Sequence, residues 1–241
     1  GNRSAARQCE RILAGCRVRV CENVMPKFGL LKTEQTQAAI RALGRDAFCI
    51  RMSVADEAAV EAAYAEVDAR FGGVDILFNN AGICICTEAE TMTLEQWRKV
   101  VDVDLTAQFL MARAAGQRMI KAGKGGAIVS TASMSGHIVN VPQPQCAYNA
   151  AKAGLIHLTK SLATEWARYN IRVNCISPGY MATPLSIDVP RERMENWFFF
   201  APMKRMGLPE ELQGAGVCLA SEAASCTTGA DIIIDGGYSC V

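Results

Sequence analysis

The chain has 241 residues, half of them hydrophobic, and a formal net charge of +1. That length fits one α/β domain with a full core and is short for two. The charge balance argues against a nucleic-acid or membrane-surface partner, whose binding depends on clustered positive charge, and no apolar run approaches the ~18 residues of a membrane span.

Strand-like and helix-like segments alternate along the chain, which is typical of a doubly wound parallel sheet. In the first half the pattern predicts, in order, a weak strand at 18–21, a helix at 33–43, a strand at 47–52, a helix at 60–71 and a strand at 74–78. The helix at 60–71 is predicted because its apolar residues recur at i, i+4, i+7 and i+11 and therefore share one face.

The second half continues the alternation. Thr93 and Gln96 form a capping box that predicts the start of a long helix reaching about Lys121. The later predicted elements are a strand ending at 133, a helix that contains residues 148 and 152 and reaches about 169, a strand at 171–176, a helix opening at 209–211 and a strand at 231–234.

Tyr148 and Lys152 carry the strongest chemical signal, with Ser133 fifteen residues upstream of the tyrosine. Residues four apart on a helix lie on one face, and a nearby cation favours the phenolate form of a tyrosine. A serine hydroxyl beside that phenol can hold a carbonyl or alcohol oxygen. An isolated match would more often be an amphipathic helix with a lysine reaching to solvent.

Three companion motifs favour the chemical interpretation. Asn79-Asn80-Ala81-Gly82, Ser133 and Pro178-Gly179 each follow a short apolar run. The carboxyl ends of strands in an open parallel sheet are where such folds bind ligands. Together with Tyr148 and Lys152, these motifs predict a site that interconverts a carbonyl and an alcohol.

The order and spacing of these motifs resemble the classical short-chain dehydrogenase/reductase family, from about Thr33 to Val241. The stretch from Ser133 through Pro142-Gln143-Pro144-Gln145 to Tyr148 resembles the branch that acts on sorbose, sorbitol, mannitol and related polyols and ketoses, as does Asp235-Gly236-Gly237-Tyr238. The resemblance implies one Rossmann-like domain over residues 1–241, with an α/β/α doubly wound parallel sheet. It also implies hydride transfer between a nicotinamide cofactor and a polyol or ketose, and a homodimer or homotetramer.

Residue roles follow from the resemblance by position. Tyr148 is expected to be the acid/base, Lys152 its activator and a ligand of the nicotinamide ribose, and Ser133 the ligand of the substrate oxygen, with Ser135 as the other serine candidate. The expected cofactor contacts are Asn80, Ala81, Gly82, Tyr148, Lys152, Pro178, Gly179 and Thr183.

The first 32 residues depart from the family pattern. The family opens with a strand and a glycine-rich turn, and no Gly-x-x-x-Gly-x-Gly follows a strand near this start, which holds five arginines instead. Either the first strand and turn are missing or altered, or the arginines form a basic phosphate-binding arm. Glu22 aligns with the acid that binds the ribose hydroxyls and favours NAD, but NADP stays open because the arginines argue the other way.

Asp104 stands where the family places an asparagine that relays protons through water to the lysine. A carboxylate accepts hydrogen bonds but cannot donate as an amide does, so the relay is in question at this position. The alternative function is therefore a catalytically impaired relative that acts at most as a scaffold or oligomer partner.

Residues 183–206 gather prolines, Trp197 and three consecutive phenylalanines. After a strand on the cofactor side, such a segment predicts a substrate lid; the alternative is a dimer or core contact.

The eleven cysteines are scattered, several within apolar runs, as expected for a reducing compartment. The start also lacks the apolar core of a signal peptide, so we expect a cytoplasmic protein. Cys84 and Cys86 are the one close pair, and no second pair or histidine cluster has zinc spacing, so no metal site is expected.

Overall fold

The structure is a computed structural model that describes residues 29–183, 186 and 191–241. The predicted strand at 18–21, the altered or missing first strand and glycine-rich turn, and the assignment of Glu22 lie outside these residues.

Four parallel strands form the described sheet, in the spatial order β1–β2–β3–β4. Their bounds are β1 Ile76–Asn79, β2 Gly126–Thr131, β3 Ile171–Pro178 and β4 Asp231–Ile234. Because all four are parallel, their carboxyl ends meet at one edge, where Asn79 lies beside Ser130 and Thr131 lies beside Ile176. β2 ends two residues before the predicted position at Ser133.

The strand predicted at 47–52 is wrong, because no strand is assigned there. Within the described residues no strand pairs with β1 on the side away from β2. Ala47 and Phe48 are nevertheless buried, and Phe48 packs against Phe71 with ring centroids 5.3 Å apart. The apolar pattern was therefore a correct signal of burial.

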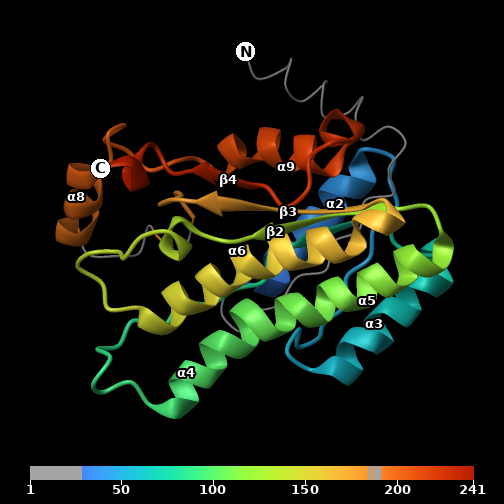
Figure 1. The fold of residues 1–241 in the computed structure, drawn as a ribbon, viewed down its shortest axis with the longest axis horizontal. Coiled ribbons are helices and arrows are strands. Elements are labelled where there is room, and N and C mark those ends of the chain that lie inside the picture. The colour runs from blue at the N-terminus through green and yellow to red at the C-terminus, as the bar shows by residue number, and fades with distance from the viewer. Residues whose placement is uncertain (1–28, 184–185, 187–190) are drawn as a thin grey trace.

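Helices cover both faces of the sheet and complete three layers (Figure 1). α5 (Ala107–Ala122) and α6 (Cys146–Trp166) pack on one face, with α3 (Glu57–Phe71) beside α5, and α9 (Gln213–Ala220) packs on the other face against β2 and β3. The remaining α-helices are α2 Gly29–Ala42, α4 Leu94–Val101 and α8 Arg191–Phe200. The shorter helices are η1 Asp102–Thr106, η2 Met134–Gly136, η3 Ala167–Tyr169, η4 Pro209–Leu212, η5 Glu222–Ala224 and η6 Tyr238–Cys240.

Local sequence explains most helix boundaries. Thr93 Oγ1 accepts from the backbone N–H of Gln96 at 3.2 Å and Gln96 Oε1 accepts from the N–H of Thr93 at 2.9 Å, so the predicted capping box is confirmed. The helix at 60–71 is confirmed as part of α3, which ends at Gly72 with a left-handed φ of 72°. The helix opening at Pro209 begins as the 3₁₀ turn η4 and continues as α9.

The long helix predicted from Thr93 to Lys121 has a π-helical turn in its middle. α4 ends at Val101, η1 follows as a π-helix, and α5 continues to Ala122. π-turns are rare and often found at functional sites. Here the turn contains Asp104, which is fully buried.

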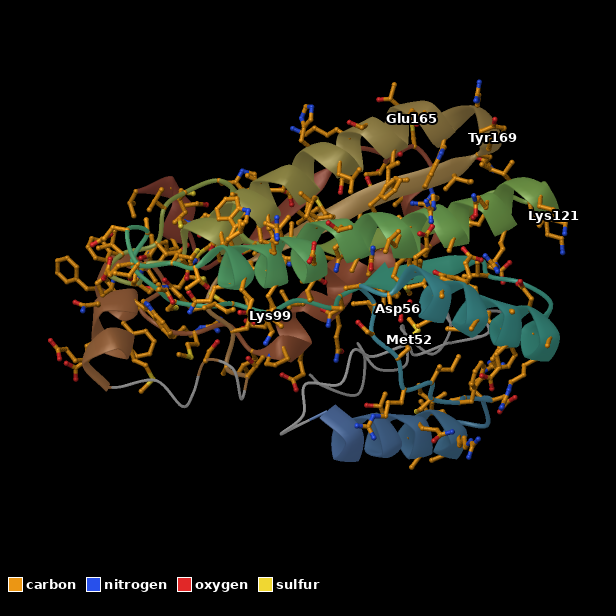
Figure 2. The ribbon with its side chains drawn as sticks, turned by 90° about the horizontal axis from the view of Figure 1, so that it is seen from below. Met52, Asp56, Lys99, Lys121, Glu165 and Tyr169 are labelled. Atoms are coloured by element: carbon orange, nitrogen blue, oxygen red, sulfur yellow. The ribbon has the colours of Figure 1, made fainter. Side chains whose placement is uncertain are left out.

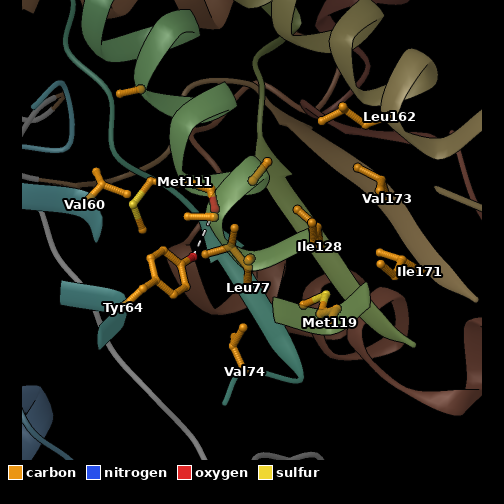
Figure 3. Packing of buried hydrophobic residues seen from close by; sticks show 14 of the residues in the cluster. Val60, Tyr64, Val74, Leu77, Met111, Met119, Ile128, Leu162, Ile171 and Val173 are labelled. Carbon is orange, nitrogen blue, oxygen red and sulfur yellow. Dashed lines mark hydrogen bonds between the residues drawn. The ribbon is translucent and has the colours of Figure 1, made fainter. Parts of the chain in front are cut away.

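The main core lies between the sheet and the layer formed by α3, α5 and α6 (Figure 3). Leu77, Ile128 and Val173 come from three adjacent strands and are buried there. The hydroxyl of Tyr64 is also buried in this core and donates to the carbonyl oxygen of Met111 at 3.1 Å, as a buried phenol requires. This core fixes the strand ends that carry the site.

The cavity lies at one end of the molecule, where the strands have their carboxyl ends. Figure 2 shows Lys121 and Tyr169, at the ends of α5 and η3, far from the end that holds α8. The carboxyl ends of the strands face the α8 end, where Trp197 of α8 and Pro178 of β3 line the same cavity. Within the described part of the chain, no helix is long and apolar enough to cross a membrane.

Candidate active site

A cavity of about 330 Å³ opens at the carboxyl ends of β2 and β3. Ser133 enters it from the turn after β2, Tyr148 from the first turn of α6, and Pro178 from the end of β3. The volume lies within the range of ~300–1,000 Å³ that small-molecule sites usually occupy. The structure thus brings together residues that are 45 positions apart in sequence.

Ser133 and Tyr148 form the polar centre of this cavity. Ser133 Oγ accepts from the backbone N–H of Ser135 at 3.1 Å, which fixes the serine oxygen. Burial raises the pKa of Tyr148 well above its usual value, a hydrogen bond from Ser133 opposes that rise, and the charge of Asp104 adds to it. The phenol is therefore protonated at neutral pH in this structure and is placed to donate.

Lys152 lies behind Tyr148, one helical turn further along α6. Its Nζ donates to the carbonyl oxygen of Thr131 at 2.8 Å and lies 5.5 Å from the centroid of the Tyr148 ring. Nζ is also 3.3 Å from Asp104 Oδ1, and both side chains are almost completely buried. Burial lowers the pKa of Lys152 and the Asp104 carboxylate opposes that change; burial likewise raises the pKa of Asp104.

Asp104 is held in place by its second oxygen. Oδ2 accepts from the backbone N–H of Ile83 at 2.9 Å, which anchors the π-helix to the segment after β1. Gly82 makes room for this arrangement, because a Cβ there would lie 2.7 Å from Asp104 Oδ1 and 3.3 Å from Lys152 Nζ. A glycine at position 82 is therefore a steric requirement of the buried pair.

The expected cofactor residues occupy the same edge of the sheet. Asn80 and Gly82 are exposed after β1, and Asn80 Oδ1 accepts from the hydroxyl of Thr131 at 2.9 Å. The carbonyl oxygen of Ala81 accepts from Gln108 Nε2 at 2.6 Å, so a side chain of α5 holds this turn in place.

On the other side of the cavity, Pro178, Gly179 and Thr183 line the wall together with Tyr148. The described residues therefore fit the nicotinamide end of a dinucleotide, with the expected contacts around the proton-transfer groups. The segment predicted to hold the pyrophosphate and the adenosine ribose lies outside them.

Sequence reasoning did not assign to the site the buried amides and Tyr180, which line the cavity wall beside Trp197 of the predicted lid. Asn140, Gln143 and Gln145 are buried there, and the first two donate to the Tyr180 hydroxyl at 3.0 and 2.7 Å. Trp197 stacks on Tyr180 with ring centroids 3.9 Å apart. Gln143 and Gln145 lay in the motif that carried the resemblance, but only the fold shows that they face the site.

Among the described side chains of α8, Trp197 lines the cavity, and the three phenylalanines that follow it do not. Trp197 is buried, whereas Phe199 and Phe200 are exposed. Cys84 also lines the cavity, with Sγ 3.8 Å from Gln145 Oε1, and a hydrogen bond with Cys86 together with burial raises the pKa of this thiol. No group of three or more potential metal ligands occurs among the described residues.

Comparison with known proteins decides the family. A family model described as "Enoyl-(Acyl carrier protein) reductase" matches residues 6–239, and a solved short-chain type dehydrogenase/reductase from Mycobacterium marinum superposes with a TM-score of 0.89 at 39% identity, covering 97% of this chain and 89% of that one. The chain belongs to the short-chain dehydrogenase/reductase family. As a member of this family it is an NAD(P)-dependent oxidoreductase that acts on a small molecule.

Several curated relatives are named for activity on a polyol or a ketose, and two of them illustrate the similarity. A "Probable NADP-dependent mannitol dehydrogenase" of Yarrowia lipolytica is 42% identical over 229 residues, which is 94% of this chain and 80% of that protein. A sorbose reductase of Candida albicans is 43% identical over 199 residues, 82% of this chain and 70% of that protein. The predicted fold and family are thereby confirmed.

Proposed function

We propose that this short-chain dehydrogenase/reductase interconverts a polyol and the corresponding ketose. The observation that carries the proposal is the position of Ser133 and Tyr148 in one polar cavity, with the Lys152 ammonium 5.5 Å from the tyrosine ring. The relatives named for mannitol and sorbose support the substrate class. The buried amides of the cavity wall support it as well, because hydroxyl groups of a substrate need such polar partners.

In the direction of reduction, Ser133 holds the carbonyl oxygen by donating its hydroxyl hydrogen. Tyr148 gives its proton to the same oxygen as negative charge develops there. Pro178 and Gly179 would hold the nicotinamide, which would supply hydride in this direction and take it up in the other. Oxidation of the alcohol runs the proton path in reverse and requires the phenolate of Tyr148.

Lys152 and Asp104 set the proton affinity of Tyr148. An ammonium near a phenol favours the phenolate, and a carboxylate that pairs with this ammonium opposes the effect. In this proposal the chain is active, but its tyrosine titrates at higher pH than it would with an asparagine at position 104. Nothing in the cavity supports the alternative of an impaired scaffold, since Ser133, Tyr148 and Lys152 are all in place.

The cofactor we propose is NADP. The sequence favoured NAD only through Glu22, which lies outside the described residues, whereas the relative from Yarrowia lipolytica is named NADP-dependent. The five arginines near the start are consistent with recognition of an additional phosphate. Fluorescence titration of the purified chain with NADPH and with NADH tests this choice, and tighter binding of NADH would contradict it.

We further propose that residues 1–241 act as one domain, with residues 183–206 as a substrate lid, and that the protein is a cytoplasmic homo-oligomer. Burial of Trp197 against the cavity supports a lid.

Exposed apolar side chains on α4 and α5, Leu94, Trp97 and Phe109, support a contact between subunits. Light scattering coupled to gel filtration gives the oligomeric state, and a monomer would contradict it.

The central test is turnover of ketoses and polyols. The purified chain with NADPH should reduce D-fructose or L-sorbose, and with NADP should oxidise D-mannitol, as followed by absorbance of the reduced cofactor. If it binds the cofactor yet turns over neither ketoses nor polyols, the proposed function is wrong and the scaffold alternative gains support.

A further inference from the structure

Two buried polar groups lie beside Ser133, and the chemistry proposed above uses neither. Ser135 and Gln145 both line the cavity and are more than nine-tenths buried. Gln145 Nε2 donates to Ser135 Oγ at 3.2 Å, and the backbone N–H of Ser135 donates to Ser133 Oγ at 3.1 Å. The pair is thus tied to the serine that receives the reacting oxygen.

The orientation of the Gln145 amide follows from a chain of hydrogen bonds that begins at Trp197. An indole N–H can only donate, so its 3.2 Å bond to Gln143 Oε1 turns the Gln143 amide nitrogen towards the Tyr180 hydroxyl. Asn140 Nδ2 donates to the same hydroxyl. Asn140 Oδ1 is then left to accept from Gln145 Nε2 at 2.9 Å.

The hydrogens of the Gln145 amide nitrogen are therefore all engaged in hydrogen bonds, whereas the amide oxygen can still accept one. Nε2 also lies 2.9 Å from Asn149 Oδ1. Within the described residues, Oε1 has only the thiol of Cys84 at 3.8 Å, which is a weak donor. Because a serine oxygen that accepts from an amide can still donate its own hydrogen, Ser135 offers a donor beside this acceptor.

A donor and an acceptor placed side by side match a hydroxyl group, which both accepts and donates. We propose that Ser135 and Gln145 bind the hydroxyl on the carbon next to the reacting carbon. The preferred substrates are then α-hydroxy ketones and the corresponding vicinal diols. This inference rests on the proposed function and names the group, shared by all ketoses, that the site recognises beside the carbonyl.

Selectivity follows from the burial of these groups. A ketone without the neighbouring hydroxyl would remove water from the Gln145 oxygen and return no strong donor to it, which is costly for a buried polar group. Sites built to hydrogen-bond a hydroxyl reject analogues that lack it much more strongly than apolar pockets reject a missing methylene.

The test compares acetoin with butanone, two ketones of the same carbon skeleton that differ by one hydroxyl next to the carbonyl. With NADPH, or with NADH if that binds more tightly, the native enzyme should show a kcat/KM at least about 100-fold higher for acetoin. Ser135→Ala should lower kcat/KM for acetoin about tenfold or more and leave that for butanone within about twofold. Gln145→Met, which keeps the side-chain length and loses the acceptor, should do the same.

Ser161→Ala is the matched control. Ser161 lies within α6, the helix that begins directly after Gln145. Its hydroxyl donates to the carbonyl oxygen of His157 at 3.2 Å within this helix. This variant should leave kcat/KM for both ketones unchanged.

Each other outcome has a defined meaning. Equal kcat/KM for acetoin and butanone in an enzyme that reduces ketoses would overturn the subsite and leave the proposed function intact. An equal loss for both ketones in Ser135→Ala and Gln145→Met would show that these residues only support Ser133, which also overturns it. An enzyme that reduces neither these ketones nor any ketose would refute the proposed function and the subsite together.

Discussion

Replacing Asp104 by asparagine should shift the pH dependence of alcohol oxidation to lower pH. Oxidation requires the phenolate of Tyr148. Burial raises the pKa of this phenol, and the Asp104 charge raises it further. Asp104 also lies 3.3 Å from Lys152 Nζ and offsets the positive charge that would favour the phenolate. Loss of the carboxylate lowers the tyrosine pKa, so the rise in rate with pH begins earlier.

The distance between Asp104 and Tyr148 sets the size of the shift. Lys152 Nζ lies 3.3 Å from Asp104 Oδ1 and 5.5 Å from the centroid of the Tyr148 ring, so the carboxylate oxygen is at most about 9 Å from the ring. Removing a unit charge at that distance, with an effective dielectric constant of about 20, changes the energy by about 2 kcal/mol. We therefore expect a shift of about 1–2 pH units.

The same substitution should destabilise the protein in a pH-dependent way. Removing the charge of one partner of a buried pair costs up to about 3–5 kcal/mol, because Lys152 then keeps the carbonyl of Thr131 but loses the carboxylate with which it pairs. Burial already lowers the pKa of Lys152 in the folded state, and Asp104 opposes this. Without Asp104 the pKa of Lys152 falls further in the folded state, so the unfolded state binds the lysine proton more readily than the folded state does. The loss of stability is therefore present at neutral pH and shrinks as pH rises towards the pKa of lysine in the unfolded state.

The assay is kcat for polyol oxidation from neutral to alkaline pH, combined with urea unfolding at both ends of that range. Asp102→Asn is the control, because Asp102 lies in the same π-helix and is exposed. It should change neither profile. An unchanged oxidation profile in Asp104→Asn, with the cofactor still bound, would refute the role given to the buried pair.

Three further substitutions test other parts of the site. Tyr148→Phe should bind cofactor normally and lose about 10²–10⁴-fold in kcat, as expected for loss of an acid/base; near-normal turnover would exclude this tyrosine. Gly82→Ala should lower kcat and thermal stability, because the new Cβ would displace Asp104 Oδ1, whereas Gly214→Ala, with open space around it in helix α9, should lower neither, since alanine favours a helix more than glycine does. Trp197→Phe should raise KM for the ketose several-fold with little change in kcat, because one hydrogen bond of about 1 kcal/mol to the cavity wall is lost; an unchanged KM would show that α8 does not shape the site.

Most of the fold could be predicted because its signals are local. The capping box at Thr93 and the apolar spacing of α3 depend on near neighbours in sequence, and both are confirmed. The strand at 47–52 failed for a non-local reason, since a strand requires a paired neighbour and the described residues provide none. Burial at Phe48 was predicted correctly, but pairing could not be.

The site divides in the same way. Tyr148 and Lys152 could be placed on one helix face from their spacing, and the family resemblance placed Asp104 near Lys152. The role of Gly82 could not be predicted, because it depends on where a carboxylate from a distant helix comes to lie. The orientation of the Gln145 amide nitrogen and oxygen could not be predicted either, because it is set by a chain of hydrogen bonds that begins at Trp197, 52 residues further along the sequence.

The π-turn at Asp102–Thr106 imposes a constraint on chain length as well as on chemistry. The i→i+5 bond of a π-turn encloses one residue more than the i→i+4 bond of an α-turn, so the additional residue is accommodated within the turn. Val100 before the turn and Ala107 after it are both completely buried. Deleting one residue from 102–106 would return this stretch to α-helical geometry and carry the carboxylate of residue 104 away from Lys152. Insertions and deletions should therefore be tolerated on the surface turns at either end of this long helix and excluded from its middle.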